Sequence, residues 1–128
     1  CREHGCMETL QRIKDRGAGC GLSVKPATPL VHILPYLGMV DMVLLMSVEP
    51  GFGGQPFIES TYEKLRQLKA LREEGSFDFD IEVDGGITAG NVADVIRAGA
   101  NVLVSGSSVF NGNIGDNIRG FLEIFKNI

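Results

Sequence analysis

The sequence has few residues of the types that build disulfide frameworks or simple metal sites. It contains three cysteines and two histidines among 128 residues. The number of cysteines is odd, and no two of Cys1, Cys6 and Cys20 have CxxC spacing. This pattern favours reduced thiols in a cytosol-like compartment over disulfides. A metal held by Cys1, His4 and Cys6 would match no known type of zinc site, so we interpret this segment as a polar entry to a helix. No Ser-His-Asp order or nucleophile elbow is present.

Long hydrophobic runs and clustered basic residues are also missing. The longest apolar stretch, around Met42 to Met46, is far shorter than the roughly 20 residues that span a bilayer. No signal-peptide pattern opens the chain. The net charge is -4 and the 12 Lys and Arg residues are scattered, whereas a nucleic-acid surface needs them clustered. We therefore expect a cytoplasmic protein with neither a membrane nor a nucleic acid as partner.

The residues that are present favour a single globular domain. Apolar residues make up 44% of the chain, which is enough for one core, and the length suits one domain. The 17 glycines fall just after apolar runs, where a barrel or a doubly wound sheet places its turns. The first residue is Cys rather than Met, and the first predicted helix has no strand before it. We therefore expect the chain to be the later part of a longer barrel.

Helices and strands alternate along the sequence. Four short apolar runs predict strands at residues 20–24, 39–48, 79–83 and 102–104. Helices are predicted at residues 7–17, 91–98 and 114–125, from Pro29 (with Pro35 shortening or kinking it), and after a capping box at Ser60. Such alternation implies parallel strands with right-handed crossovers, which is the α/β class.

Three predicted strands end in glycine-rich segments: residues 51–54, Asp84-Gly85-Gly86, and residues 105–108. Any one of them could be only a flexible turn. Two such ends on the last two strands, however, match the phosphate site that follows strands seven and eight of a (β/α)8 barrel. Together they favour phosphate binding, because glycine lets a phosphate approach the backbone N–H groups.

The third predicted strand carries two acidic residues. Alternation places Ile81 and Val83 on the helix side and Glu82 and Asp84 on the opposite side, which would be the barrel interior. We interpret Glu82 as one partner of a buried ion pair, with Lys25 the candidate cation. Asp84 lies at the rim, where a substrate would bind, although an Asp before Gly-Gly is also a common turn former.

Long stretches of the sequence resemble the ribulose-phosphate 3-epimerase family. They are residues 46–55, 81–87 and 98–107, supported by residues 25–29 and 41–46, in the family's order and over nearly the whole chain. The family fold is a (β/α)8 TIM barrel. The resemblance implies that residues 1–128 are one partial barrel domain, the C-terminal half with about strands five to eight.

The resemblance also implies an activity. It is the interconversion of D-ribulose 5-phosphate and D-xylulose 5-phosphate, a step of the pentose phosphate pathway, by two-base proton transfer at C3. Asp84 would be one of the two catalytic acids and a ligand to a divalent metal, zinc by preference, with iron, manganese or cobalt as alternatives. The implied substrate- and phosphate-contacting residues are Met46, Gly51, Phe52, Gly53, Gly54, Asp84, Gly85, Gly86, Gly106 and Ser107.

The chain departs from the family in its metal ligands. The family's His-x-Asp pair, second His and early Ser belong to the first half-barrel, and His4 and His32 do not replace them in spacing or strand context. We therefore expect that this chain alone neither retains the metal nor epimerises, and that its open strand edges favour a homo-oligomer. Three alternatives stay open: a hexulose-phosphate 3-epimerase, a non-catalytic phosphate-binding half-barrel, and a plastid parent protein.

Overall fold

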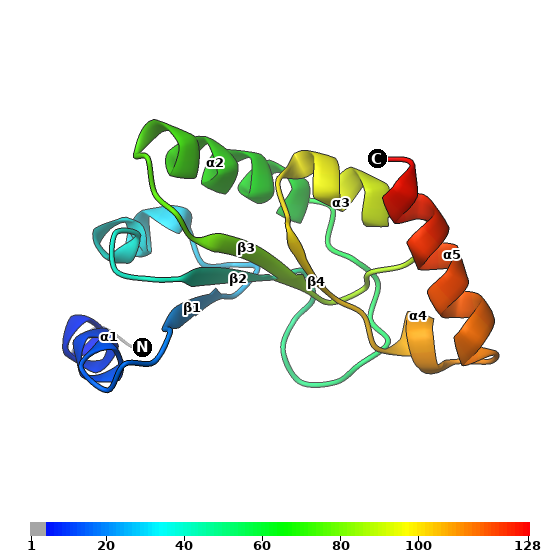
Figure 1. Ribbon diagram of the computed structural model, residues 1–128, viewed down its shortest axis with the longest axis horizontal. Coiled ribbons are helices and arrows are strands. Elements are labelled where there is room, and N and C mark those ends of the chain that lie inside the picture. Colours follow the sequence, from blue (N-terminus) through cyan, green and yellow to red (C-terminus); the bar gives the residue numbers. More distant parts are fainter. Residues whose placement is uncertain (1–4) are drawn as a thin grey trace.

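Four parallel strands form one sheet in the computed structural model, which describes residues 5–128. The strands are β1 (Gly21–Val24), β2 (Met42–Met46), β3 (Asp80–Asp84) and β4 (Val102–Val104), and they pair in the order β1-β2-β3-β4 (Figure 1). The α/β class with parallel strands is confirmed. The predictions for Cys1 and His4 lie outside the described residues.

The α-helices follow the predicted alternation except between β1 and β2, where the chain forms 3-10 turns, and there is one additional short helix. They are α1 (Cys6–Lys14), α2 (Thr61–Glu74), α3 (Val92–Ala98), α4 (Ser107–Phe110) and α5 (Ile114–Lys126). The short helix α4 was not predicted. It occupies the segment between β4 and α5, so the last glycine-rich strand end leads into α4 before the final helix begins.

The segment from Pro29 does not form the single helix that the sequence favours. It forms two 3-10 turns, η1 (Leu30–His32) and η2 (Leu34–Tyr36). The physical reason is Pro35, which has no N–H for a helical hydrogen bond and clashes with the preceding turn. Hydrogen bonds three residues apart take over, such as the one from Ile33 N–H to Leu30 O at 3.0 Å.

The capping box predicted at Ser60 is wrong. Ser60 has helical backbone angles, φ -63° and ψ -13°, and its side chain makes no capping hydrogen bond. A turn just before α2 provides the acceptors instead. Thr61 N–H donates to Ile58 O at 2.9 Å and Tyr62 N–H donates to Glu59 O at 3.1 Å. Backbone carbonyls thus accept the hydrogen bonds from N–H groups of the first helical turn that a capping side chain would otherwise accept.

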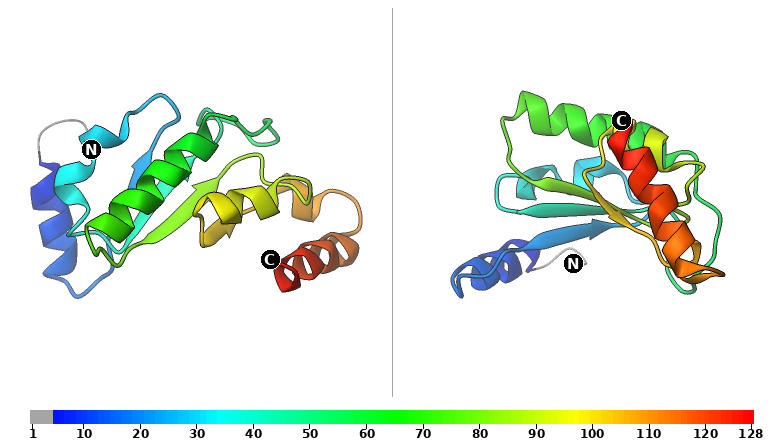
Figure 2. Two further views of the ribbon diagram at one scale, coloured as in Figure 1. Left: turned by 90° about the horizontal axis from the view of Figure 1, so that it is seen from above. Right: turned by 45° about the vertical axis from the view of Figure 1, so that its right-hand side comes forward.

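Helices α2 and α3 lie over one face of the sheet, and the views in Figures 1 and 2 agree on this. Val43, Leu45, Ile81 and Val83 point into this layer and are fully buried. The alternate residues of β2 and β3 point to the other face, where several remain partly exposed. The predicted alternation of β3 is therefore confirmed, with Glu82 and Asp84 on the face that no helix of residues 5–128 covers.

The ion pair predicted between Glu82 and Lys25 is wrong. Each ion pair found within residues 5–128 joins two residues three positions apart on one helix, and none includes either residue. Glu82 is only half-buried, so water can reach its carboxylate and no counter-ion is needed.

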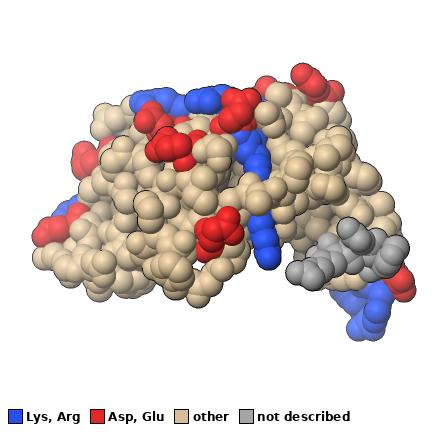
Figure 3. Space-filling model, turned by 180° about the vertical axis from the view of Figure 1, so that it is seen from behind, with Lys and Arg blue, Asp and Glu red and all other residues tan. Residues whose placement is uncertain are grey.

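The surface is mixed in charge but carries an apolar stripe on α5. Acidic and basic side chains are interspersed on the face seen in Figure 3, without a broad area of one sign. In α5, Ile114, Ile118, Leu122 and Phe125 are 42% to 50% exposed, although their spacing resembles a core-facing side. The part of the chain that the structure describes has no helix long and apolar enough to cross a membrane.

Candidate functional site

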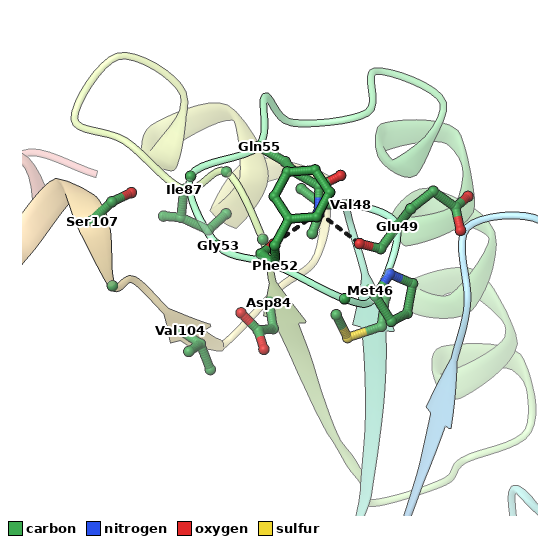
Figure 4. Close-up of a pocket in the computed structure, with 16 residues that line it drawn as sticks. Met46, Val48, Glu49, Phe52, Gly53, Gln55, Asp84, Ile87, Val104 and Ser107 are labelled. Carbon is green, nitrogen blue, oxygen red and sulfur yellow. Dashed lines mark hydrogen bonds between the residues drawn. The ribbon is translucent and has the colours of Figure 1, made fainter.

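A pocket of about 420 Å³ opens at the carboxyl ends of β2, β3 and β4 (Figure 4). Parallel strands bring the loops that follow them to one edge of the sheet, and for that reason segments far apart in sequence meet here. All ten residues predicted for the site line this pocket. The full lining comprises Met46, Val48, Glu49, Pro50, Gly51, Phe52, Gly53, Gly54, Gln55, Asp84, Gly85, Gly86, Ile87, Val104, Gly106 and Ser107.

Asp84 occupies the centre of the strand ends. It is the last residue of β3 and pairs in register with Met46 of β2 on one side and Val104 of β4 on the other. Figure 4 shows its carboxylate between these two apolar side chains. Asp84 is partly exposed and lines the pocket, so its carboxylate is accessible to a ligand there.

The loop after β2 forms one wall of the pocket, and Gln55 ties it together. Gln55 Nε2 donates hydrogen bonds to Glu49 O at 2.7 Å and to Phe52 O at 2.8 Å. These bonds close the glycine-rich segment into a curve and leave Phe52 at the rim, with 73% of its surface exposed. The sequence predicted the glycines and Phe52 here but not the role of Gln55.

Gly85 and Gly86 are required by close packing as well as by backbone conformation. Gly85 has φ +125° and Gly86 has φ +64°, angles that favour glycine. A Cβ atom at Gly85 would lie 2.6 Å from Val48 Cγ2, and one at Gly86 would lie 2.4 Å from Phe57 N. The loop after β2 therefore rests directly on the glycine pair, and this contact holds the two walls of the pocket together.

Ser47 connects β2 to the loop after β3 and was missed by the sequence reasoning. Ser47 is fully buried, its N–H donates to Asp84 O at 2.9 Å, and its Oγ donates to Gly85 O at 2.5 Å. Ile58 N–H donates to Ser47 O at 2.8 Å. The available signal was a hydroxyl residue immediately after an apolar strand, since a buried polar group needs partners.

Asn91 and Ser105 hold the next two carbonyls of the same loop. Asn91 Nδ2 donates to Gly86 O at 2.9 Å, and its Oδ1 accepts Thr88 N–H at 2.8 Å. Ser105 Oγ donates to Ile87 O at 3.2 Å. Three side chains from different parts of the chain, counting Ser47, therefore fix three consecutive carbonyls of the segment after Asp84.

Lys64 ties the loop after β1 to α2. Its Nζ donates to three backbone carbonyls, those of Pro26 at 2.6 Å, Thr28 at 2.8 Å and Lys25 at 3.3 Å. Burial lowers the pKa of the Lys64 ammonium from its ordinary value. This contact links β1 to the element that follows the pocket loop of β2.

The pocket contains acidic side chains but no basic ones. Among residues 5–128, Glu49 and Asp84 line it and no Lys or Arg does, so an anion bound here would rely on backbone N–H groups and the Ser107 hydroxyl. Within residues 5–128 no three His, Cys, Asp or Glu side chains converge to hold a metal. His32 is exposed on η1, and His4 lies outside the described residues. These residues alone do not fit a metal cage.

A parallel sheet with glycine-rich loops and a carboxylate at its strand ends defines the class of α/β proteins that bind ligands at that edge. Within this class, the Ribulose-phosphate 3 epimerase family model matches residues 2–110. The chain belongs to this family.

Curated relatives carry the corresponding enzyme name, that of an isomerase. The chain is 52% identical to the chloroplastic ribulose-5-phosphate-3-epimerase of Arabidopsis thaliana over 120 residues, which cover 94% of this chain and 41% of the relative. It is 46% identical to the ribulose-phosphate 3-epimerase of Serratia marcescens over 102 residues, covering 80% of this chain and 49% of the relative. The chain therefore spans about half the length of the curated relatives it matches.

Proposed function

We propose that this chain is the C-terminal half, about strands five to eight, of a (β/α)8 barrel whose pocket binds a pentulose 5-phosphate. The completed barrel interconverts D-ribulose 5-phosphate and D-xylulose 5-phosphate in the pentose phosphate pathway. The observation that carries this proposal is the convergence of Asp84 with three glycine-bearing strand-end segments on one pocket. The family membership supports the choice of substrate.

In this proposal Asp84 moves the proton at C3 on one face of the substrate. A proton next to a carbonyl is weakly acidic, so its removal needs a positioned base and stabilisation of the resulting enediolate. Asp84 lies open to the pocket beside Met46, which would contact the enediolate. The glycine-rich segments, with Phe52 at the rim and Ser107 on the far wall, would surround the sugar phosphate.

Epimerisation requires a second acid on the opposite face, because one carboxylate returns the proton to the side it came from. Glu49 is the other carboxylate in the pocket lining, and Figure 4 shows its side chain directed away from Asp84. We therefore propose that this chain supplies one of two catalytic acids and does not epimerise alone.

The same reasoning applies to the metal. We propose that Asp84 is one ligand of a divalent metal, zinc by preference, with iron, manganese or cobalt as alternatives. Because residues 5–128 place no cluster of ligands around Asp84, the remaining ligands must come from outside them. We expect the isolated chain to bind such a metal weakly or not at all.

The open edges of the sheet favour association with another chain. In the described structure β1 and β4 each have one edge without a paired strand, and the apolar stripe of α5 is uncovered. We propose a homo-oligomer for the isolated chain in the cytoplasm, or in the plastid if the parent protein resides there. Light scattering that shows a monodisperse monomer would contradict the oligomer without affecting the substrate assignment.

An activity test separates these proposals. The purified 128-residue chain with added zinc should not convert D-ribulose 5-phosphate, followed by NMR of the sugar. Adding a separately produced N-terminal half of the Serratia marcescens relative should restore turnover. Asp84→Asn should then lower the rate by about 10² to 10⁴, the usual contribution of a positioned acid or base. Asp94→Asn, on the exposed side of α3, is the matched control and should leave the rate unchanged.

Each alternative gives a distinct outcome. Robust turnover by the 128-residue chain alone would contradict the need for a second acid. Turnover of a hexulose 6-phosphate in preference to the pentulose would identify the hexulose-phosphate enzyme. Binding without turnover in the completed barrel would indicate a non-catalytic phosphate-binding half-barrel.

A further inference from the structure

We propose that Ser47 and Asn91 are positioning residues that direct two peptide N–H groups, those of Gly86 and Ile87, at an anionic oxygen of the bound ligand. The anion is taken as a phosphate group, and in that respect the inference rests on the proposed function. Neither Ser47 nor Asn91 lines the pocket. They act through the backbone of the segment that follows Asp84.

The geometry of the peptide bond gives the first step. In a trans peptide the C=O and the N–H of one unit point in opposite directions, and the described chain has no cis peptide bond. Ser47 Oγ donates to Gly85 O at 2.5 Å. The N–H of Gly86 belongs to the same peptide unit, so it points away from Ser47. Because Ser47 is fully buried, its hydroxyl cannot turn to solvent instead.

The next peptide unit is held in the same manner by a different element. Asn91, directly before α3, donates through Nδ2 to Gly86 O at 2.9 Å, so the N–H of Ile87 points away from Asn91. Asn91 is itself oriented, because its Oδ1 accepts Thr88 N–H at 2.8 Å. The amide therefore cannot flip without losing both hydrogen bonds.

The two N–H groups that result are adjacent and without a protein acceptor. Gly86 and Ile87 both line the pocket, and in the part of the chain that the structure describes neither N–H donates to a protein group. The positive φ angles of Gly85 and Gly86, which glycine adopts freely, bend the backbone just after β3, beside the pocket that Gly86 and Ile87 line. Because no Lys or Arg of residues 5–128 lines the pocket, such N–H groups are among the few donors that it offers an anion.

The test follows backbone amide signals by ¹⁵N NMR while inorganic phosphate, and separately D-ribulose 5-phosphate, is added to the 128-residue chain. In the unmodified chain the Gly86 and Ile87 signals should shift as each probe binds. Ser47→Ala and Asn91→Ala should each weaken binding about tenfold, which corresponds to about 1.4 kcal/mol. Ser47→Thr keeps the hydroxyl donor and should restore the shift of Gly86.

Asn101→Ala is the matched control. Asn101 accepts Ile81 N–H and donates to Asp80 Oδ1, both at 2.6 Å, so it also bridges two groups, but at the opposite end of β3. This variant should lose stability yet bind both probes as the unmodified chain does. If the role of Asn91 were merely structural, Asn91→Ala and Asn101→Ala would have the same effect on the binding of the two probes.

The outcomes distinguish this inference from the proposed function. If Ser47→Ala and Asn91→Ala bind both probes as tightly as the unmodified chain, the positioning role is refuted and the proposed function stands. If the unmodified chain binds neither probe in this pocket, both fail. If Asn101→Ala weakens binding as much as Asn91→Ala, general destabilisation explains the effect and the inference is overturned. Should Ser47→Ala fail to fold, Asn91→Ala and Ser47→Thr still decide the question.

Discussion

Replacing Gly86 with alanine is the perturbation that most severely tests the construction of the pocket. The new Cβ atom would lie 2.4 Å from Phe57 N, 2.8 Å from Phe57 Cα and 3.0 Å from Gln55 O. All three are backbone atoms, so no side chain can rotate to make room. The loop after β2 must move as a unit, and it carries the glycine-rich wall of the pocket.

The magnitude follows from two costs. A left-handed conformation costs a non-glycine residue about 1–2 kcal/mol, and Gly86 has φ +64°. Overpacking a closely packed contact costs about 1–3 kcal/mol. We therefore expect Gly86→Ala to lower the free energy of unfolding by about 2–5 kcal/mol, which is a large part of the stability of a small domain.

Urea unfolding followed by circular dichroism measures this change, with phosphate binding as a second readout. Gly120→Ala is the control, because Gly120 lies inside α5 and a Cβ atom there meets no atom within 4 Å. Alanine should stabilise that helix by about 0.5–1 kcal/mol. A Gly86→Ala protein within about 0.5 kcal/mol of the unmodified chain, the range of a neutral surface change, would refute the packing argument.

Two further predictions concern α2. Lys64→Met leaves three carbonyls of the loop after β1 without their hydrogen-bond donor and should lower the free energy of unfolding by about 1–3 kcal/mol, measured by urea unfolding. Lys69→Met is the control. If it lowers the free energy of unfolding equally, the carbonyl contacts of Lys64 are not the cause. Burial, then the charges of Glu59 and Asp94, raise the pKa of Tyr62 above 10.0. Because the pKa of Tyr62 is higher in the folded than in the unfolded state, its contribution to stability is fully present below pH 10 and is lost as the pH rises further. Tyr62→Phe cannot ionise, so it should gain stability relative to the unmodified chain above that pH. Parallel curves of the free energy of unfolding from pH 8 to 11 would contradict this.

The sequence predicted the parts of the fold that depend on local pattern. The apolar run at residues 39–48 predicted a strand, which the structure has at Met42–Met46, and the alternation around Asp84 predicted that Glu82 and Asp84 share one face of the sheet; both predictions are confirmed. The glycine-rich strand ends pointed to one site, since parallel strands bring those ends together, and the family resemblance supplied the individual residues such as Met46 and Ser107. The structure shows that they do meet in one pocket.

The predictions from the sequence failed where long-range contacts or backbone angles determine the structure. Ser60 has the residue type of a cap but helical backbone angles, and these angles depend on the preceding turn rather than on Ser60 itself. Glu82 faces the uncovered side of the sheet and makes no ion pair with Lys25 in the described structure. Ser47 and Asn91 act on carbonyls 38 and 5 residues away, respectively, and no spacing rule in the sequence predicts such pairs.

The most direct test of the central claim is to map where D-ribulose 5-phosphate binds on this chain. The ¹⁵N signals should change for the strand-end segments 49–55, 84–87 and 106–107, which line one pocket, and a sugar with no phosphate should produce much smaller changes. Signals that change mainly elsewhere, or equally with the unphosphorylated sugar, would contradict the assignment of this pocket to a sugar phosphate.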